Sequence, residues 1–358
     1  MSTLQLPLIS SRMNLRSALG CVNRVCSGWA MLLVLLFYSA NAVHAESVDE
    51  VTRHARSPLS SSLPQAGERD NASLREFHDN VTIVQSEDGG PYADFSNALR
   101  TILSARGITS VEVDFTKPIP SSGLVIGVGM KAATAVAASN APAVLNVLIS
   151  KTGYEKLLRD FPHRAGSHNF SAIFLDQPIH RQVHLMVAIL PNKHNVGILY
   201  SSPPEELAQL KQELTEHGLS LHEQAVGPEL PLSNALQEIL LGRSEALLAM
   251  PDAAVYNSST IRNILLATYR RGIPLIGFSP GYVNAGALCA VFSTPAQIAA
   301  QAAVLTRQFG NTGVLAAAQY PQEFEVMINE QVVRSLGLQI KSASELHDKI
   351  SADNGSEQ

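Results

Sequence analysis

Short apolar runs that favour β-strands alternate along this chain with segments whose apolar residues recur at helical spacing. Val81–Gln85 shows the first strand pattern. In Tyr92–Arg106 the residues Phe95 and Leu99 fall on one helical face, and Gly107 then provides a typical C-cap. Strands joined through helices pair in parallel, and a parallel sheet is covered by helices on both faces. The alternation therefore predicts an α/β fold.

The alternation runs through two rounds. In the first round, we expect further elements over residues 110–115, 124–128, 131–139, 144–150, 171–175 and 181–190. The second round opens with Asn195–Tyr200 and continues over residues 204–217, 219–224, 232–241, 246–251, 253–256, 259–271, 274–278, 287–292, 295–309 and 324–328. Two rounds predict two Rossmann-like lobes with parallel sheets, joined by a hinge. Ligands of such sheets bind at the carboxyl ends of the strands.

The N-terminal segment has the pattern of an export signal. Residues 1–28 carry Arg12, Arg16 and Arg24 and no acidic residue, and the apolar run Trp29–Tyr38 follows them. A membrane-spanning helix needs about 20 apolar residues, so this run is too short to span a bilayer. We therefore expect a cleaved signal peptide and a periplasmic protein, with an uncleaved membrane anchor as the alternative.

Small residues at Val43 and Ala45 place the expected cleavage after Ala45, and Met13 is an alternative start that leaves a shorter basic region. The segment 46–78 is polar, shows no apolar period and is expected to be flexible. We expect residues 79–190 and about 287–318 to form lobe 1, residues 193–284 and about 319–342 to form lobe 2, and residues 343–358 to be a C-terminal tail.

Charge and cysteine content limit the kinds of partner and of cysteine pairing that we expect. The chain has 26 basic and 31 acidic residues without a block of like charge, so we expect no nucleic-acid partner. Cys21 and Cys26 lie in the leader, which leaves Cys289 as a single thiol that cannot pair within the mature chain. Residues 18–21 loosely resemble a lipoprotein box, but no apolar stretch precedes them.

From about residue 173 the chain resembles a known family. The resemblance rests on Phe174–Pro178, Asn195–Ser201, Tyr269–Ser279, Tyr320–Pro321 and Arg334–Leu338, in this order and spacing. These segments are similar to those of the ABC-transporter substrate-binding family whose members include tryptophan-binding lipoproteins. The resemblance covers roughly residues 81–340 and is dense from 173 to 338.

The resemblance implies a type I periplasmic binding fold, with two lobes joined by three crossing segments and a ligand in the cleft between them. It implies a binding protein rather than an enzyme, with an amino-acid-like ligand, an ABC transporter permease as partner, and no cofactor. A membrane sensor that reads ligand occupancy is the alternative partner, and we expect a monomer. The first lobe matches the family poorly, so a ligand specificity set there does not transfer.

Polar residues that follow expected strands are the candidate ligand-binding residues. Asp176 and Gln177 follow one strand and are suited to hold a ligand ammonium, although a turn or N-cap role explains them equally well. In the second lobe, four polar residues, Asn257 to Thr260, are more than a helix cap requires. The full candidate set is Ser86, Tyr92, Met130, Asp176, Gln177, Ser201, Asn257, Ser258, Thr260, Ser279 and Tyr282.

The sequence gives little support for two other kinds of site, a serine-hydrolase centre and a metal site. Gly277–Gly281 matches the G-x-S-x-G motif of serine hydrolases around Ser279, but the next residue is Pro280, which has no N–H for an oxyanion hole. A hydrolase is therefore a remote alternative. His180 and His184 have the spacing of metal ligands on a helix, but no Cys or acidic cluster in the sequence completes a set. We therefore expect no metal.

Overall fold

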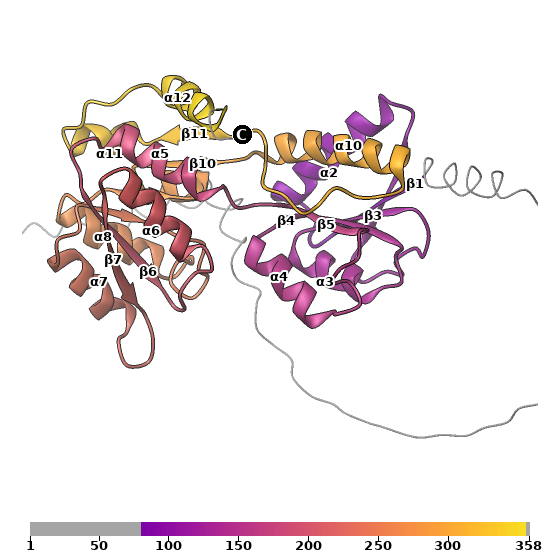
Figure 1. Cartoon of the computed structure of the whole chain (residues 1–358), viewed down its shortest axis with the longest axis horizontal. Coiled ribbons are helices and arrows are strands. Elements are labelled where there is room, and N and C mark those ends of the chain that lie inside the picture. The colour runs from indigo at the N-terminus through magenta and orange to yellow at the C-terminus, as the bar shows by residue number, and fades with distance from the viewer. Residues whose placement is uncertain (1–79, 356–358) are drawn as a thin grey trace, which may run out of the picture.

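Each round of the alternation forms its own sheet in the computed structural model, which describes residues 80–355 (Figure 1). The first lobe has a fully parallel sheet in the order β2-β1-β3-β4-β5. Its strands are β1 (Asn80–Gln85), β2 (Thr109–Asp114), β3 (Leu124–Val128), β4 (Ala143–Ile149) and β5 (Phe170–Phe174). Strands β3, β4 and β5 are buried along their whole length, as expected for a sheet covered on both faces.

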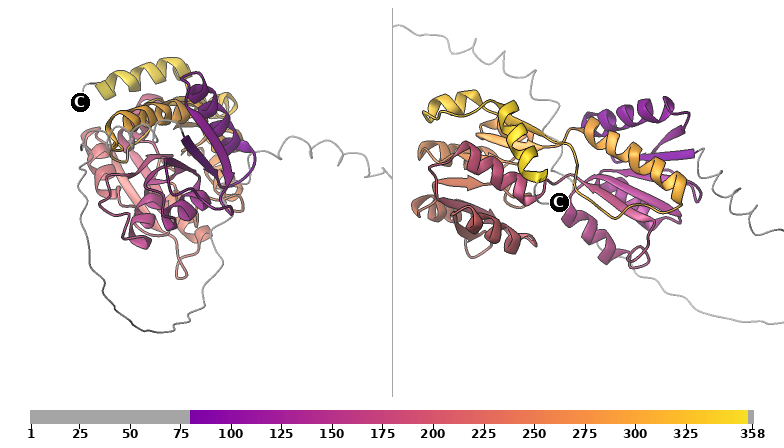
Figure 2. Two further views of the ribbon diagram at one scale, coloured as in Figure 1. Left: turned by 90° about the vertical axis from the view of Figure 1, so that its right-hand side faces the viewer. Right: turned by 45° about the horizontal axis from the view of Figure 1, so that its top comes forward.

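Two pairs of helices cover this sheet. On one face α2 (Gly90–Ser104) packs beside α10 (Pro295–Thr312), which returns from the far end of the sequence (Figure 2). Their apolar sides, including Phe95 and Phe309, share one core with β1, β3 and β4. On the other face, α3 (Met130–Ala138) and α4 (Lys151–Asp160) close a second core.

The second lobe has a sheet in the order β11-β10-β9-β8-β6-β7, in which only β11 runs antiparallel to its neighbour among the described strands. Its strands are β6 (Asn195–Tyr200), β7 (Ser220–Ala225), β8 (Ala246–Leu248), β9 (Leu275–Gly277), β10 (Cys289–Phe292) and β11 (Glu325–Ile328). The predicted α/β fold with two lobes is confirmed, with β11 as the exception to parallel pairing.

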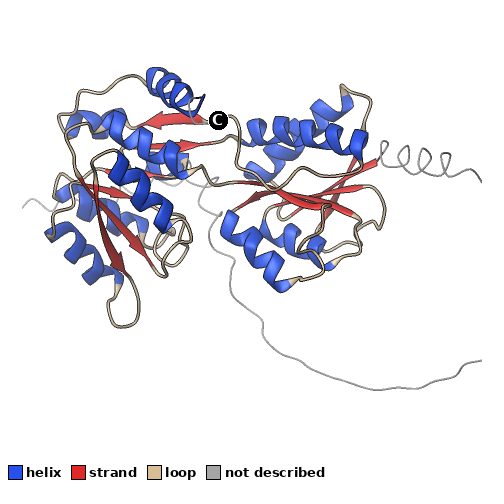
Figure 3. Ribbon diagram, viewed as in Figure 1, coloured by secondary structure: helices blue, strands red, loops and turns tan. Residues whose placement is uncertain are grey.

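Helices cover both faces of this second sheet as well (Figure 3). One core holds residues of α5 (Ile179–Ile189), α6 (Leu207–Glu216), α11 (Glu330–Ser335) and α12 (Ala343–Gly355). The opposite core holds residues of α7 (Leu232–Leu241), α8 (Ile261–Arg270) and α9 (Pro280–Ala285).

The chain crosses between the lobes at 175–178, 293–294 and 320–324, which differs from the expected boundaries. Helix α5 belongs to the second lobe, because Val183, Met186 and Ile189 pack in the core of the second sheet. Strand β10 likewise lies in the second sheet. Periodicity identifies a helix or strand but does not say which of two similar sheets it joins, so the sequence placed both elements in lobe 1.

Two local expectations also differ from the structure. Residues 253–256 form a turn, because the Asp252 carboxylate accepts the backbone N–H groups of Ala254 and Val255 at 2.9 and 3.3 Å and holds the chain away from an extended path. The expected tail from residue 343 contains α12, whose Leu346 and Ile350 are fully buried in the core of the second lobe.

The expected signal peptide, its cleavage after Ala45 and the polar segment 46–78 lie outside the described residues. Within residues 80–355, no helix combines the length and the apolar character needed to cross a membrane.

Candidate functional site

The ends of strands from both lobes meet in one pocket beside the first crossing segment. The carboxyl ends of β4 and β5 supply its wall from the first lobe, and residues after β6 and β8 supply the wall from the second. The pocket has a volume of about 50 Å³. It is lined by Lys151, Thr152, Asp176, Gln177, Ile179, Gln182, Pro204, Glu206, Met250, Pro251 and Tyr320.

An ion pair crosses the pocket from one lobe to the other. Lys151, the first residue of α4, lies 3.0 Å from the Glu206 carboxylate at the start of α6. Burial alone lowers the pKa of Lys151, but its hydrogen bonds with Glu206 and Tyr320 outweigh burial and raise the pKa. The Lys151 ammonium also lies 5.9 Å from the centre of the Tyr320 ring. The lysine is therefore held as a cation between the two lobes.

Asp176 places a negative charge close to this ammonium. Its Oδ2 accepts the backbone N–H of Lys151 at 2.6 Å, so the carboxylate occupies the N-terminus of α4, where the helix dipole favours an anion. Burial nevertheless raises the pKa of Asp176 to about 6. Asp176 thus caps a helix and lines the pocket, which combines the two roles that the sequence left open.

A β-bulge sets the point at which the chain leaves β4 and enters α4. The register of β4 against β5 shifts between Val147 and Ile149, and Leu148 has a φ of 53°, which is rare for a side chain branched like leucine. The bulge turns the end of β4 directly into α4, where the Ser150 side chain accepts the N–H of Gly153 at 3.0 Å. Lys151 therefore leaves the sheet at the edge that faces the second lobe.

Buried hydrogen bonds join the three crossing segments behind the pocket. Gln177 on the first segment donates to the Ser293 hydroxyl on the second at 2.8 Å. Ser293 in turn donates to the backbone oxygen of Glu323 on the third at 2.6 Å. A chain of two hydrogen bonds therefore links all three crossings.

Arg181 of α5 strengthens this link. Its guanidinium donates to the Gln177 side chain at 3.0 Å and to the backbone oxygens of Pro321 and Gln322 at 2.8 and 3.0 Å. It also stacks 4.6 Å from the Phe324 ring. Burial lowers the pKa of Arg181, with the charge of Glu323 acting in the opposite direction. We call Gln177, Arg181, Ser293 and the backbone of residues 321–323 the hinge network.

Of the predicted ligand-binding residues, the structure brings Asp176 and Gln177 into this pocket. Ser86, Tyr92 and Met130 lie together at the ends of β1 and β3. The Ser86 hydroxyl accepts the N–H of Ala132 at 2.9 Å and thereby caps α3. The Tyr92 ring and Ser86 approach Gly129 so closely that a Cβ atom there would lie 2.5 Å from the ring.

Three of the predicted residues of the second lobe, Ser201, Asn257 and Thr260, are bonded to loop residues of the same lobe. Ser201 donates to the Asp252 carboxylate through its N–H and its hydroxyl, at 2.6 and 2.8 Å. The Asn257 side chain accepts the N–H of Thr260 at 3.2 Å, and Thr260 donates to the backbone oxygen of Val255 at 2.7 Å. Ser258 is exposed.

Tyr282 is buried and donates to the backbone oxygen of Tyr256 at 3.0 Å, so it packs in the core of the second lobe. Burial raises the pKa of Tyr282. Ser279 is the residue before α9, and Pro280 occupies the first position of that helix. The backbone after Ser279 therefore has no N–H to form an oxyanion hole there.

The sequence missed the other nine residues of the pocket, among them Lys151, Gln182, Glu206 and Tyr320. Lys151 directly follows an expected strand, so the rule that located Asp176 could have found it. Glu206 lies inside an expected helix pattern, and only the packing of the lobes shows that it faces the pocket. The buried side-chain oxygen of Gln182 has no hydrogen-bond partner within the described structure.

A larger cavity of about 490 Å³ lies at the opposite edge of the first sheet, near the amino ends of β1 and β3. Arg106, Arg307 and the backbone around Gly310 line it, together with apolar residues of both strands. It touches neither the second lobe nor the crossing segments, so binding of a ligand there would not depend on how close the two lobes are. We therefore favour the smaller pocket.

Comparison with known proteins agrees with the two-lobed fold. The sequence pattern of the family described as "ABC transporter substrate binding protein" matches residues 119–346. No curated protein matches the chain significantly. Among solved structures, a conserved domain protein from Vibrio cholerae is 21% identical, with a TM-score of 0.54 over 75% of this chain and 98% of the other.

Two further solved structures have functional names. A substrate-binding protein with adhesive properties from Clostridium difficile, in its ligand-free, open form, is 16% identical, with a TM-score of 0.57 over 74% of this chain and 96% of the other. A Streptococcus pneumoniae domain in complex with L-Trp is 14% identical, with a TM-score of 0.54 over 75% of this chain and 98% of the other. At these identities the likeness supports the fold alone.

Proposed function

The chain belongs to the family of ABC transporter substrate-binding proteins, and we propose that it captures an amino-acid-like ligand in the pocket between its lobes. In this proposal the protein is exported to the periplasm by its N-terminal segment and acts there as a monomer. It presents the bound ligand to the permease of an uptake transporter. Members of the family bind substrate without converting it, so Ser279 needs no catalytic role.

The observation that carries the proposal is that charges of both signs meet at the pocket. Lys151 offers an ammonium donor, while Asp176 and Glu206 offer carboxylate acceptors. The unpaired oxygen of Gln182 adds a further acceptor. A zwitterionic amino acid needs this combination, because its carboxylate requires donors and its ammonium requires acceptors. A neutral sugar carries neither of the two charges that such a site can pair with.

The remaining wall suits an apolar or aromatic side chain. Ile179, Pro204, Met250 and Pro251 are apolar, and Tyr320 offers the face of a ring. Binding pockets for small molecules combine such walls with a few polar groups that orient the ligand. The Streptococcus structure with L-Trp supports an amino acid with a large side chain as the first candidate.

Both lobes contribute to the pocket, so a ligand would favour the state in which they are close together. Asp176 and Lys151 adjoin the first lobe, and Glu206 and Met250 belong to the second. A cavity of 50 Å³ holds only a few waters, so an amino acid requires the lobes to separate before it binds. We expect opening and closing about the crossing segments.

A thermal-shift screen of the purified protein tests this proposal. The panel is L-tryptophan, the other amino acids, tryptamine, indole-3-propionate and a set of sugars. We expect an amino acid to raise the melting temperature, because a ligand at 100 times its Kd adds about 2.7 kcal/mol of stability. Tryptamine lacks the carboxylate and indole-3-propionate lacks the ammonium, so each should bind far more weakly than the amino acid.

Asp176→Asn should abolish the ligand-induced shift relative to its own unliganded baseline. Asp160→Asn removes an exposed carboxylate at the C-terminal end of α4, the helix whose N-terminus Asp176 caps, and should leave the shift intact. Stabilisation by sugars alone, or a full shift in Asp176→Asn, would contradict the amino-acid proposal.

A further inference from the structure

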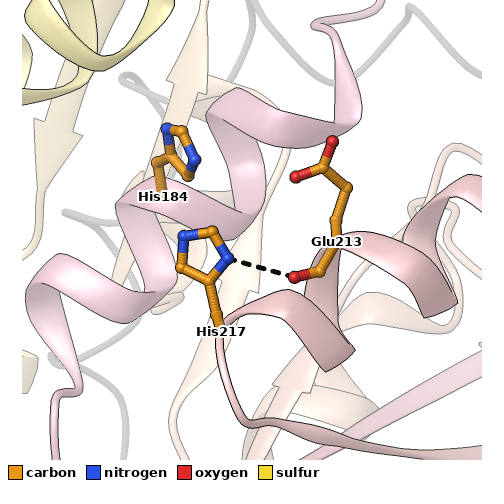
Figure 4. Close-up of side chains that lie close together, drawn as sticks. All are labelled: His184, Glu213 and His217. Atoms are coloured by element: carbon orange, nitrogen blue, oxygen red, sulfur yellow. Dashed lines mark hydrogen bonds between the residues drawn. The ribbon is translucent and has the colours of Figure 1, made fainter. Parts of the chain in front are cut away.

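Two histidines and a glutamate come together on the second lobe, between α5 and α6. His184 lies on α5, Glu213 on α6 and His217 directly after α6. One ligand atom from each lies within 4.8 Å of the other two. Figure 4 shows the three side chains around one space between the helices. Of these three residues the sequence pointed only to His184, through its spacing from His180, because Glu213 and His217 come from a different helix and the residue after it.

A hydrogen bond to the backbone orients the His217 ring for metal binding. Its Nδ1 lies 3.1 Å from the backbone oxygen of Glu213, shown as the dashed line in Figure 4. A carbonyl oxygen only accepts, so Nδ1 carries the proton and Nε2 of the neutral ring keeps its lone pair. Metal-binding histidines are commonly oriented in this way, by a hydrogen bond from the second ring nitrogen to a carbonyl or carboxylate.

His184 contributes a buried imidazole ring to the cluster. Its side chain is only 8% exposed, and its Nδ1 is buried without a hydrogen-bond partner. The Asp353 carboxylate of α12 lies 3.8 Å from this Nδ1, which is too long for a hydrogen bond. The rings of His184 and His217 have their centres 5.0 Å apart. Because Nδ1 lies on the side of Asp353, Nε2 is the ring nitrogen that faces His217 and is available to a cation shared with it (Figure 4).

We propose that His184, Glu213 and His217 bind a divalent transition-metal ion, for which Zn²⁺ is the best match. Two imidazoles and one carboxylate form a common Zn²⁺ ligand set that leaves one coordination position for water. Glu213 is half-buried and His217 is exposed, so the ion reaches the site from solvent. Helix geometry places Glu213 about 10 Å along α6 from Glu206, so this site is separate from the ligand pocket.

Titration of the purified protein, prepared without a histidine tag, tests the proposal. We expect calorimetry with ZnCl₂ to show one tight site per chain. Co²⁺ in its place should give the visible absorption bands of a four-coordinate centre. His217→Ala should weaken Zn²⁺ binding by at least about 100-fold, because loss of even an outer partner costs 10- to 100-fold. Glu213→Gln should weaken it and alter the Co²⁺ spectrum.

His168→Ala is the matched control, because it removes an exposed histidine of the first lobe. This control should bind Zn²⁺ like the original protein. His217 and Glu213 are not core residues, so both variants should retain the original circular dichroism spectrum and melting temperature in the absence of metal. The proposal fails if the original protein binds no Zn²⁺, or if His217→Ala and Glu213→Gln bind it with unchanged affinity.

Discussion

The two lobes touch in two regions that differ in chemistry. At the hinge network, buried hydrogen bonds of neutral groups and one guanidinium join the three crossing segments. At the outer edge, α4 of the first lobe faces the start of α6 (Figure 1), and the contacts are ion pairs: Lys151–Glu206, partly buried at the pocket, and Arg159–Glu205, open to solvent. Arg159 and Glu205 there are 3.9 Å apart and both more than half exposed.

This difference separates two tasks. Buried polar groups that lose their partners pay the full cost of desolvation, so the hinge network resists being broken. Exposed ion pairs contribute about 0–1 kcal/mol and form and break easily. The hinge network therefore keeps the lobes attached, while the outer edge is free to open and close over the pocket.

The largest expected effect is that of Arg181→Met. This substitution keeps the aliphatic stem but leaves the backbone oxygens of Pro321 and Gln322 and the Gln177 side chain without their donor. We expect a loss of about 3–5 kcal/mol in the free energy of unfolding, measured by urea denaturation, because three buried acceptors lose their donor at once. Arg100→Met removes an exposed pair with Glu112 and should cost less than about 1 kcal/mol. Equal losses of unfolding free energy at both positions would contradict the distinction between the buried hinge network and exposed ion pairs.

A smaller effect is expected at Ser293. Ser293→Ala removes the hydroxyl that donates to the Glu323 backbone oxygen and accepts from Gln177. The expected loss is about 1–2 kcal/mol in the same urea experiment. Ser335→Ala, which removes an exposed hydroxyl bonded within its own helix, is the control and should be close to neutral. A neutral Ser293→Ala would show that the second crossing contributes little to the hinge network.

The smallest effect should appear at the outer edge as a dependence on pH. Burial, and a hydrogen bond with Glu205 across the lobes, raise the pKa of Glu155 to about 7, with Lys151 opposing and Glu206 reinforcing the shift. A carboxyl whose pKa is raised on folding favours the protonated form, so its contribution is lost as pH rises towards 7. Above that pH, the two carboxylates repel and only Arg159 and Lys151 offset them.

Small-angle scattering of the unliganded protein should therefore show a slightly larger radius of gyration at pH 8 than at pH 6.5. Glu155→Gln should reduce this difference, because an amide does not ionise. Asp176, whose pKa is raised to about 6, changes charge mostly below this range. A pH dependence that persists in Glu155→Gln would place the titrating group elsewhere.

The sequence predicted the two lobes well because burial on both faces of a sheet leaves continuous apolar runs, as in Leu124–Val128. It predicted Asp176 and Gln177 because they directly follow such a run. The sequence alone does not distinguish polar residues that bond to each other, such as Asn257 and Thr260, from polar residues that face a ligand. The contribution of Glu206 depends on how the lobes meet, and no local pattern carries that information.

The return of α10 to the first lobe also governs the order in which the protein can fold. Phe95 and Leu99 of α2 share their core with Ile298 and Phe309, which a ribosome adds about 200 residues later. Until then, the early strands expose an apolar face, and incomplete chains of this kind tend to aggregate. Nascent chains therefore expose this face for most of synthesis, and the second lobe, apart from its last strand and helices, is made before the first can finish.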